Sequence, residues 1–390
     1  MTDTTATVDL LRLDDLLSDE ERQIRDLVRA WVRDRILPTI EDWFEAGTFP
    51  ARELATELGG LGLLGMHLEG YGGAGATATA YGLACLELEA GDSGLRSFVS
   101  VQGSLAMYAI HSFGSEEQKQ TWLPRMAAGE AIGCFGLTEA DSGSDPGSMR
   151  TAARRDGEDW ILRGTKMWIT NGSVADVAIV WAGTENGIRG FVVPTDAPGF
   201  SAPDIHRKLS LRASVTSELV LDDVRLPGDA VLPGVTGLKG PLSCLSEARY
   251  GIVWGVMGAA RACLESAVDY ATTRIQFDKP IGAFQLTQKK LADMALEVWK
   301  GTLLAVHLGR MKDDGRLTPE QVSVGKLNNT REALEVARIA RAIHGANGIT
   351  LEYPIMRHMT NLESVLTYEG TEEIHTLVVG HALTGLRAFS

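Results

Sequence analysis

The stretch DGEDWILRGTKMWITNG, residues 156–172, decides the fold. It begins with an Asp-Gly pair and ends with an Asn-Gly pair, both typical of tight turns, and two short runs of β-type residues lie between them. Two more such runs follow at Val177–Trp181 and Gly190–Val193, with a further Asn-Gly pair at residues 186–187. The region from residue 132 to residue 240 is therefore predicted to form a compact antiparallel sheet or barrel.

Helical patterns lie on both sides of this region. Ser18 and Glu21 have the spacing of a capping box, and apolar residues spaced by three and four positions follow them. Beyond residue 241 the patterns are longer and predict a four-helix bundle, with helical blocks at Ser246–Arg274, Gln285–Lys312, Pro319–His344 and Pro354–Phe389. The predicted class is α+β, with an N-terminal α-helical domain (residues 1–131), a middle antiparallel β-barrel domain (132–240) and a C-terminal four-helix-bundle domain (241–390).

Composition argues against several classes of function. The 390-residue chain carries 37 basic and 51 acidic residues, a formal net charge of −14, which argues against broad contact with a nucleic-acid backbone. Its four cysteines and eight histidines show neither CxxC nor HExxH spacing, so no metal site is expected. No uninterrupted apolar stretch is long enough to cross a bilayer. The acidic start of the chain is unlike a transit peptide, so we expect a cytoplasmic bacterial protein and not one of the mitochondrial matrix.

Residues 60–65, GLGLLG, match the GxGxxG spacing of a dinucleotide-binding turn. That motif works where a strand ends and a helix begins, because the helix N-terminus then meets the pyrophosphate. The residues before it, RELATEL at 52–58, are good helix formers. We therefore interpret the motif as the glycine-rich end of a helix and infer no Rossmann fold from it.

Three other parts of the chain have residues suited to a ligand. The first combines CFGLTEADSGSD (134–145) with KMWITN (166–171). These residues either bind a planar ring with a polar edge or are two strand edges joined by a loop. The second, RIQFDKPIGAFQ (274–285), begins with a basic residue that either binds a phosphate or complements a helix end. The third combines HGANGI (344–349) with YEGT (368–371), where Glu369 is either a catalytic base or a solvated carboxylate at a helix junction.

Taken together, the three parts resemble the acyl-CoA dehydrogenase family, flavoproteins that desaturate acyl-CoA thioesters between Cα and Cβ. The resemblance covers nearly the whole chain, from about Ser18 to Phe389. It implies an N-terminal helical domain, a middle β-barrel and a C-terminal four-helix bundle, with FAD bound between the last two and completed by a neighbouring subunit. It further implies a homotetramer, and electron-transfer flavoprotein as the electron acceptor.

Carried over position by position, the resemblance assigns the FAD contacts to two groups. Residues of the middle domain line and cover the flavin, with Thr170 near its N5 edge; they are Phe135, Leu137, Thr138, Gly143, Ser144, Trp168, Ile169 and Thr170. Residues of the C-terminal domain contact the remainder of FAD, in part across a subunit interface; they are Arg274, Phe277, Gln285, His344, Gly345, Ala346, Thr371, Glu373 and Phe389. The family commonly has glycine where this chain has Asp278 and His344, so the contacts there depart from the family pattern.

Glu369 aligns with the catalytic base of the family. The α-proton of a thioester is weakly acidic, so this carboxylate must be desolvated and its pKa raised. The resemblance implies that the Glu369 N–H and a flavin hydroxyl stabilise the enolate, while the β-hydrogen leaves as hydride to the flavin. Ser144 and the stretch from Leu242 to Arg249 match the part of the family that holds the CoA arm.

The segment EAGDSGLRSFVSVQ, residues 89–102, indicates one branch of the family. Most members have no arginine in this segment, whereas Arg96, Ser97 and Ser100 resemble the glutaryl-CoA dehydrogenase branch, in which arginine and serine bind the distal carboxylate of the substrate. That branch oxidises glutaryl-CoA and then releases CO2 to give crotonyl-CoA, a step in lysine and tryptophan degradation. Tyr368 and Glu89 match its decarboxylating type, and Gly370 is assigned to the same substrate site.

The residues leave alternatives open. One alternative is that Arg96 is a surface or helix-cap arginine. A second is that the enzyme is a non-decarboxylating glutaryl-CoA dehydrogenase, which stops at glutaconyl-CoA, and a third is that it is a general dehydrogenase for another short-chain acyl-CoA. A flavin-binding scaffold without catalysis is disfavoured because Glu369, Thr138, Thr170 and Arg96 are all present. An acyl-CoA oxidase would instead reduce O2 and release peroxide.

Overall fold

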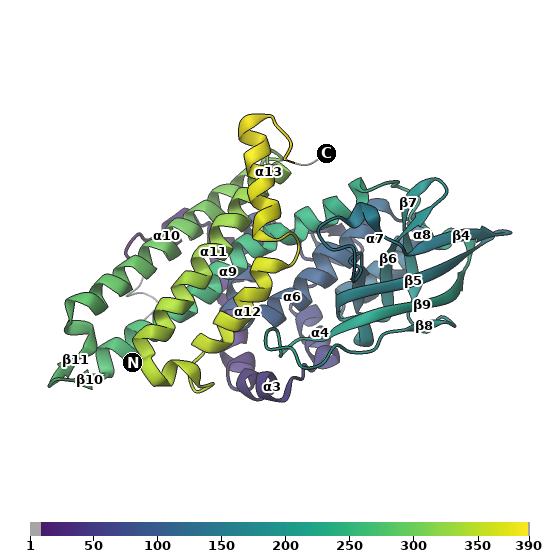
Figure 1. Cartoon of the computed structure of the whole chain (residues 1–390). Helices are drawn as coiled ribbons and strands as arrows, with labels where there is room; N and C mark the ends of the chain where they lie inside the picture. Colours follow the sequence, from purple (N-terminus) through teal and green to yellow (C-terminus); the bar gives the residue numbers. More distant parts are fainter. Residues whose placement is uncertain (1–8, 389–390) are drawn as a thin grey trace.

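Two helical regions that are far apart in the sequence pack together, and a β-sheet lies at one end of them (Figure 1). The computed structural model describes residues 9–388. The order of helices, then sheet, then helices agrees with the predicted α+β class. Within residues 9–388, the helix α4 (Ala51–Gly60) leads into the GLGLLG motif at residues 60–65 and no strand does, as expected for a helix end.

The N-terminal helices lie between residues 19 and 127. The predicted capping box is confirmed: the Ser18 hydroxyl accepts a hydrogen bond from the Glu21 N–H at 3.2 Å, and the Glu21 carboxylate accepts one from the Ser18 N–H at 2.8 Å. The helices are α2 (Asp19–Trp31), α3 (Ile40–Ala46), α4 (Ala51–Gly60), α5 (Ala78–Gly91), α6 (Ser93–Ser100), α7 (Tyr108–Phe113) and α8 (Glu116–Ala127), with π-helical turns at Val32–Ile36 and Val101–Met107 and a small hairpin of β1 (Glu69–Gly70) and β2 (Gly73–Ala74).

Seven strands form the main sheet, in the spatial order β3-β6-β4-β5-β9-β8, with β7 paired to β6. Two of the three predicted turns, at residues 156–157 and 186–187, form the β4–β5 and β6–β7 hairpins. The third, at Asn171 and Gly172, leads instead into a 3-10 turn before β6. The strands are β3 (Gly133–Gly136), β4 (Ala152–Asp156), β5 (Asp159–Thr170), β6 (Val177–Thr184), β7 (Gly187–Pro194), β8 (Phe200–Ser201) and β9 (Thr216–Leu226).

The prediction of an antiparallel barrel holds only in part. β3 runs parallel to β6, and β4 meets β6 in parallel at Ala152 and Gly183. Turn residues constrain strands that are neighbours in the sequence, whereas β3 reaches β6 across the β4–β5 hairpin, so no turn reveals its direction. The sheet curls, and the Met167 N–H donates to the Thr138 carbonyl at 2.8 Å where the chain after β3 returns to β5. Within residues 9–388, no strand pairing between β3 and β8 closes the barrel.

The C-terminal helices confirm three predicted blocks and correct the fourth. α9 (Lys239–Thr273), α10 (Gln285–Asp313) and α11 (Pro319–His344) are continuous, and a hairpin of β10 (Ile275–Gln276) and β11 (Lys279–Pro280) joins α9 to α10. The block from Pro354 to Phe389 was predicted as one helix and is two, α12 (Ile355–Thr367) and α13 (Glu372–Thr384). The reason is local: Glu369 and Gly370 have φ angles of 54° and 96°, which no right-handed helix can contain.

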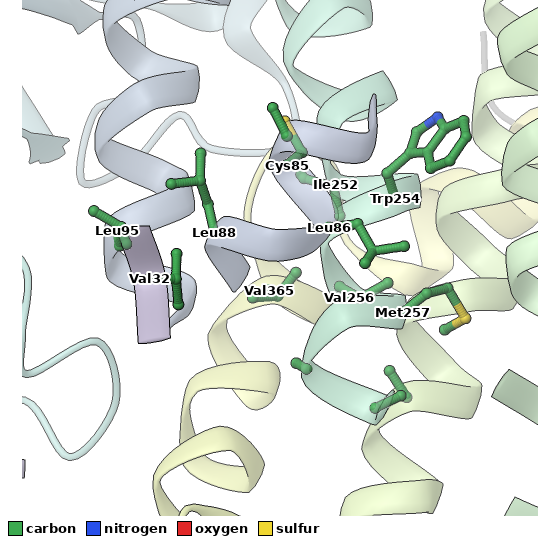
Figure 2. Packing of buried hydrophobic residues seen from close by; sticks show 14 of the residues in the cluster. Val32, Cys85, Leu86, Leu88, Leu95, Ile252, Trp254, Val256, Met257 and Val365 are labelled. Carbon is green, nitrogen blue, oxygen red and sulfur yellow. The ribbon is translucent and has the colours of Figure 1, made fainter. Parts of the chain in front are cut away.

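The two helical regions share one hydrophobic core, in which α5 lies along α9. Figure 2 shows side chains of this contact, among them Cys85, Leu86, Leu88, Ile252, Trp254 and Met257. The backbones approach closely, because a Cβ added at Gly258 would lie 1.8 Å from the Leu86 carbonyl oxygen. The N-terminal and C-terminal helices therefore cannot bury their apolar faces without each other.

α9 is also long and apolar enough to cross a membrane by the criteria of length and composition. However, 72% of its most apolar 18-residue stretch is buried inside the protein. The same helix supplies much of the shared core, including Ile252 and Trp254. Its apolar composition is thus accounted for by packing within the protein.

Gly258→Ala tests the close approach of α5 and α9. The added methyl group would overlap the Leu86 carbonyl oxygen, so the two helices must separate, and we expect the free energy of unfolding to fall by about 2–3 kcal/mol. Denaturant unfolding measures the change. Gly380→Ala in α13 is the matched control, because nothing lies within 4 Å of an added Cβ there. A Gly258→Ala protein as stable as wild type would contradict this packing.

Candidate active site

The turn between α12 and α13 presents Glu369. Its φ of 54° lies in the left-handed region, which a residue other than glycine rarely adopts. Gly370 follows with a φ of 96°, and a Cβ there would lie 2.8 Å from His375 Nε2 and 3.2 Å from Arg249 Nη2. Glycine is required at residue 370 both for its backbone conformation and for space.

Two cations, the half-buried Arg249 and the buried Lys326, hold the backbone of this turn. Arg249, on α9, donates from Nε to the Glu369 carbonyl at 2.6 Å. Lys326, on α11, donates from Nζ to the Tyr368 carbonyl at 2.8 Å and to the Gly370 carbonyl at 2.7 Å. The predicted assignment of Arg249 to the substrate site thus corresponds to a direct contact with the backbone of the predicted base.

Glu369 is half-buried, and one oxygen of its carboxylate is desolvated. Its Oε2 is buried and has no hydrogen-bond partner within the described chain. Burial raises the pKa of Glu369 above its ordinary value of 4.5, although the positive charges of Arg96, Lys326 and Arg249 oppose this shift. A carboxylate in this state is a stronger base than one in water, as proton abstraction beside a carbonyl requires.

Arg96 lies beside this turn with no exposed surface. Its Nε donates to Glu89 Oε2 at 2.7 Å, and its Nη2 donates to the Tyr368 hydroxyl. The same hydroxyl is 3.1 Å from Ser97 Oγ. Arg96 Nη1 and Ser100 Oγ are buried without a partner in residues 9–388. Nε and Nη2 of the guanidinium are thus bound by the protein, while Nη1 and the Ser100 hydroxyl remain available to an anion.

A buried ion pair fixes α6, the helix that carries Arg96, against α12. Asp92 caps the start of α6 by accepting from the Gly94 N–H at 2.7 Å. The other oxygen of Asp92 accepts from Arg357 Nη1 at 2.7 Å and from Asn361 Nδ2 at 2.9 Å, both on α12. Because α12 ends directly before Tyr368, this network sets the distance between Arg96 and the turn.

The first predicted group of FAD contacts forms one continuous region on β3, the loop after it and β5. Trp168 has a φ of 63° and its indole is 60% exposed, while Thr138 and Thr170 are half-buried and Phe135, Leu137 and Ile169 are buried. Gly143 and Ser144 are exposed on the loop, whose Gly147 packs against Leu238 just before α9. Leu242, near the start of α9, is 40% exposed. An exposed flat ring beside hydroxyls fits the polar edge of a planar cofactor.

Part of the second predicted group, Arg274, Phe277 and Gln285, lies far from the first group, at the opposite end of the helices near β10 and β11 (Figure 1). Arg274 and Gln285 are exposed there, and Phe277 is 88% exposed at the tip of the hairpin. The neighbouring Asp278 has a φ of 62°, a backbone conformation that favours glycine. One chain therefore cannot bring these three residues and the first group to one FAD molecule.

The remaining predicted cofactor residues differ in their surroundings. His344 is buried, and its two ring nitrogens lie 2.9 Å from the Ala340 carbonyl and 3.1 Å from Ser266 Oγ, so Gly345 and Ala346 form the exposed surface at this point. Thr371 caps α13, and Glu373 is exposed on its first turn. Phe389 lies outside the described residues.

Sequence reasoning missed Lys326 and His375. The signal for Lys326 is its position on α11 among residues of the buried face, such as Val322, Asn329 and Ala333. His375 lies on the buried side of α13, with Nδ1 3.0 Å from Ser323 Oγ. Burial lowers the pKa of His375 to about 3, so its ring is neutral at physiological pH.

Comparisons with known proteins identify the family of this chain. Three family profiles match the chain: the N-terminal domain of acyl-CoA dehydrogenases over residues 18–130, the middle domain over 134–224 and the C-terminal domain over 236–384. The chain belongs to the acyl-CoA dehydrogenase family. The human mitochondrial short-chain specific acyl-CoA dehydrogenase (Homo sapiens) is 36% identical over 95% of this chain and 92% of its own length.

Two solved structures from Mycobacterium smegmatis are more similar. A glutaryl-CoA dehydrogenase is 71% identical, with a TM-score of 0.97 over 98% of this chain and 99% of its own. A second glutaryl-CoA dehydrogenase, in complex with FADH2, is 64% identical with the same TM-score and coverage. The expected relation to this family, to its glutaryl-CoA dehydrogenases and to FAD as cofactor is thereby confirmed.

Glu89→Gln tests how Arg96 is held. Removing the carboxylate charge leaves the guanidinium buried and uncompensated, and we expect the free energy of unfolding to fall by about 3 kcal/mol or more. Denaturant unfolding measures this loss. The control is Asp34→Asn, which breaks the solvent-exposed ion pair with Arg33 and should leave stability unchanged. Equal stability of Glu89→Gln and wild type would mean that Glu89 does not compensate the charge of Arg96.

Proposed function

We propose that the protein is an FAD-dependent glutaryl-CoA dehydrogenase that oxidises glutaryl-CoA and decarboxylates it to crotonyl-CoA and CO2. The observation that carries this proposal is the buried Arg96, whose Nη1 has no partner in the described chain and which touches Tyr368, the residue before the base Glu369. The two similar structures named glutaryl-CoA dehydrogenase support it.

A buried donor without an acceptor costs free energy, so Arg96 is an unfavourable lining for a pocket that receives an apolar acyl tail. A distal carboxylate removes this cost, because it accepts the hydrogen bond that Nη1 offers. Ser100 Oγ, also without a partner among residues 9–388, offers a second hydrogen bond. The acyl group that fits is therefore one with an acid at its far end.

Glu369 removes the α-proton of the substrate. Its own N–H has no acceptor within residues 9–388 and is available to the thioester carbonyl, where negative charge develops as the proton leaves. FAD, when bound, would accept the β-hydrogen of the substrate together with its two electrons. Thr138, Trp168 and Thr170 are the side chains that would hold its ring system, and Arg274, Phe277 and Gln285 of another copy of the chain would hold its distal part.

In this proposal the same residues also support decarboxylation. After oxidation the distal carboxylate is vinylogous to the thioester, so loss of CO2 leaves a dienolate that the same carbonyl hydrogen bonds stabilise. Protonated Glu369 can return its proton to the γ-carbon. Tyr368, hydrogen-bonded to Arg96 and near Ser97, keeps this end of the pocket polar.

A general short-chain acyl-CoA dehydrogenase is the second candidate, and the 36% identity to the human short-chain enzyme supports it. Arg96 argues against it for the reason given above. We further propose electron-transfer flavoprotein as the acceptor. We also propose a homotetramer as the assembly, because the middle-domain FAD contacts of one chain lie at the opposite end of its helices from Arg274, Phe277 and Gln285. A cytoplasmic location and a place in lysine and tryptophan degradation complete the proposal.

Arg96→Met tests the recognition of the distal carboxylate. We expect kcat/KM for glutaryl-CoA to fall by about 100-fold or more, whereas kcat/KM for butyryl-CoA should change by less than about tenfold, because butyryl-CoA has no carboxylate to lose a partner. The double variant Arg96→Met with Glu89→Gln removes both buried charges and separates recognition from stability. An equal loss on both substrates in a folded double variant would contradict the proposal.

The pH profile tests Glu369 as the base. Only the ionised carboxylate accepts a proton, and burial raises its pKa above 4.5, so kcat/KM should fall as the pH is lowered, with a midpoint above that ordinary value. Glu369→Gln should lower kcat by about 1,000-fold at every pH while FAD content is unchanged. An FAD-containing Glu369→Gln protein with the full rate would exclude Glu369 as the base.

A further inference from the structure

Lys326 makes contacts that the catalytic mechanism given so far does not use. Three successive carbonyl groups, those of Tyr368, Glu369 and Gly370, each accept a hydrogen bond from a cationic side chain. Arg249 binds the middle carbonyl, and Lys326 binds the two on either side of it. The peptide groups that flank the catalytic base are thus held by a single ammonium group.

The burial of Lys326 is unusual for a lysine. The residue is 1% exposed, and within the described chain its Nζ donates to these two carbonyls and makes no ion pair. An ammonium group in such a place costs free energy unless nearby charges or dipoles compensate it. The charged groups that influence it are the carboxylate of Glu369 in the turn, Arg249 on α9 and Arg96 on α6, and the neutral ring of His375 lies on α13.

These contacts hold Glu369 in an unfavourable backbone conformation. A left-handed backbone at a residue other than glycine costs about 1–3 kcal/mol and persists where the surroundings fix it. With φ at 54°, Glu369 would relax to the right-handed or extended region if its neighbouring peptides were free to turn. That relaxation would change the direction in which the carboxylate points.

We propose that Lys326 is a positioning residue for dehydrogenation: its ammonium group fixes the peptides on both sides of Glu369 and so holds the base in its left-handed conformation toward the substrate. Lys326 does not touch the reacting atoms in this proposal. It acts through the backbone of Glu369, by the two hydrogen bonds that its Nζ donates to the flanking carbonyls. The inference rests on the dehydrogenation proposed above.

Lys326→Met is the test, because methionine matches the length of the side chain and removes both the charge and the donors. We expect kcat to fall by about 100-fold, since a small misplacement of a catalytic group has an effect of this size, while KM changes by less than about threefold. The deuterium isotope effect with substrate labelled at the α-carbon should rise, because proton abstraction becomes slower relative to the other steps. Lys300→Met, which removes an exposed lysine of α10 paired with Glu297, is the control and should behave as wild type.

A purely structural lysine would give a different pattern. It would lower the melting temperature and the FAD content of Lys326→Met without raising the isotope effect per bound flavin, and that result would overturn the proposal, as would a kcat within threefold of wild type. If Lys326→Met does not fold, Lys326→Gln takes its place, because it keeps one donor; an unchanged isotope effect there would also overturn the proposal. A wild type that oxidises butyryl-CoA but not glutaryl-CoA would refute the proposed substrate, and the test of Lys326 would then be made with butyryl-CoA.

Discussion

The positive charge of a guanidinium group with no exposed surface has to be compensated by neighbouring groups. The site of this protein depends on the groups that compensate the charge of Arg96. Glu89 balances its charge at 2.7 Å, and Tyr368 accepts a further hydrogen bond. Because Tyr368 begins the turn that carries Glu369, the group that recognises the far end of a substrate and the group that removes its α-proton are joined through one tyrosine. The Asp92–Arg357 ion pair keeps the two supporting helices in register.

The same turn explains why the C-terminal helices are built as they are. α12 and α13 would form one longer helix if residues 369 and 370 had right-handed backbones, and the carboxylate of Glu369 would then lie along a helix surface. The break places it at a buried junction, where α9 and α11 supply Arg249 and Lys326. α9, which supplies Arg249 to this junction, packs along α5 in the core shared by the two helical regions (Figure 2).

The sequence predicted those features that depend on local chemistry. The Ser18 capping box and the hairpins at residues 156–157 and 186–187 need only neighbouring residues, and the structure has them. The parallel pairing of β3 with β6 and the break between α12 and α13 depend on distant contacts, so periodicity did not reveal them. Glu369 and Arg96 were found through resemblance to a family, whereas Lys326 was missed because a lysine within a helical pattern is ordinarily exposed. Its burial arises from the packing of α11 against α9 and from its contacts with the turn between α12 and α13.

The central claim is that Arg96 and Glu369 together select and oxidise an acyl-CoA with a distal carboxylate. The most direct measurement is an anaerobic titration of the purified FAD-containing protein with glutaryl-CoA, in which the flavin absorption spectrum and the released CO2 are followed together. The account predicts stoichiometric bleaching of the flavin band with release of CO2. Bleaching by butyryl-CoA while glutaryl-CoA leaves the spectrum unchanged would contradict it.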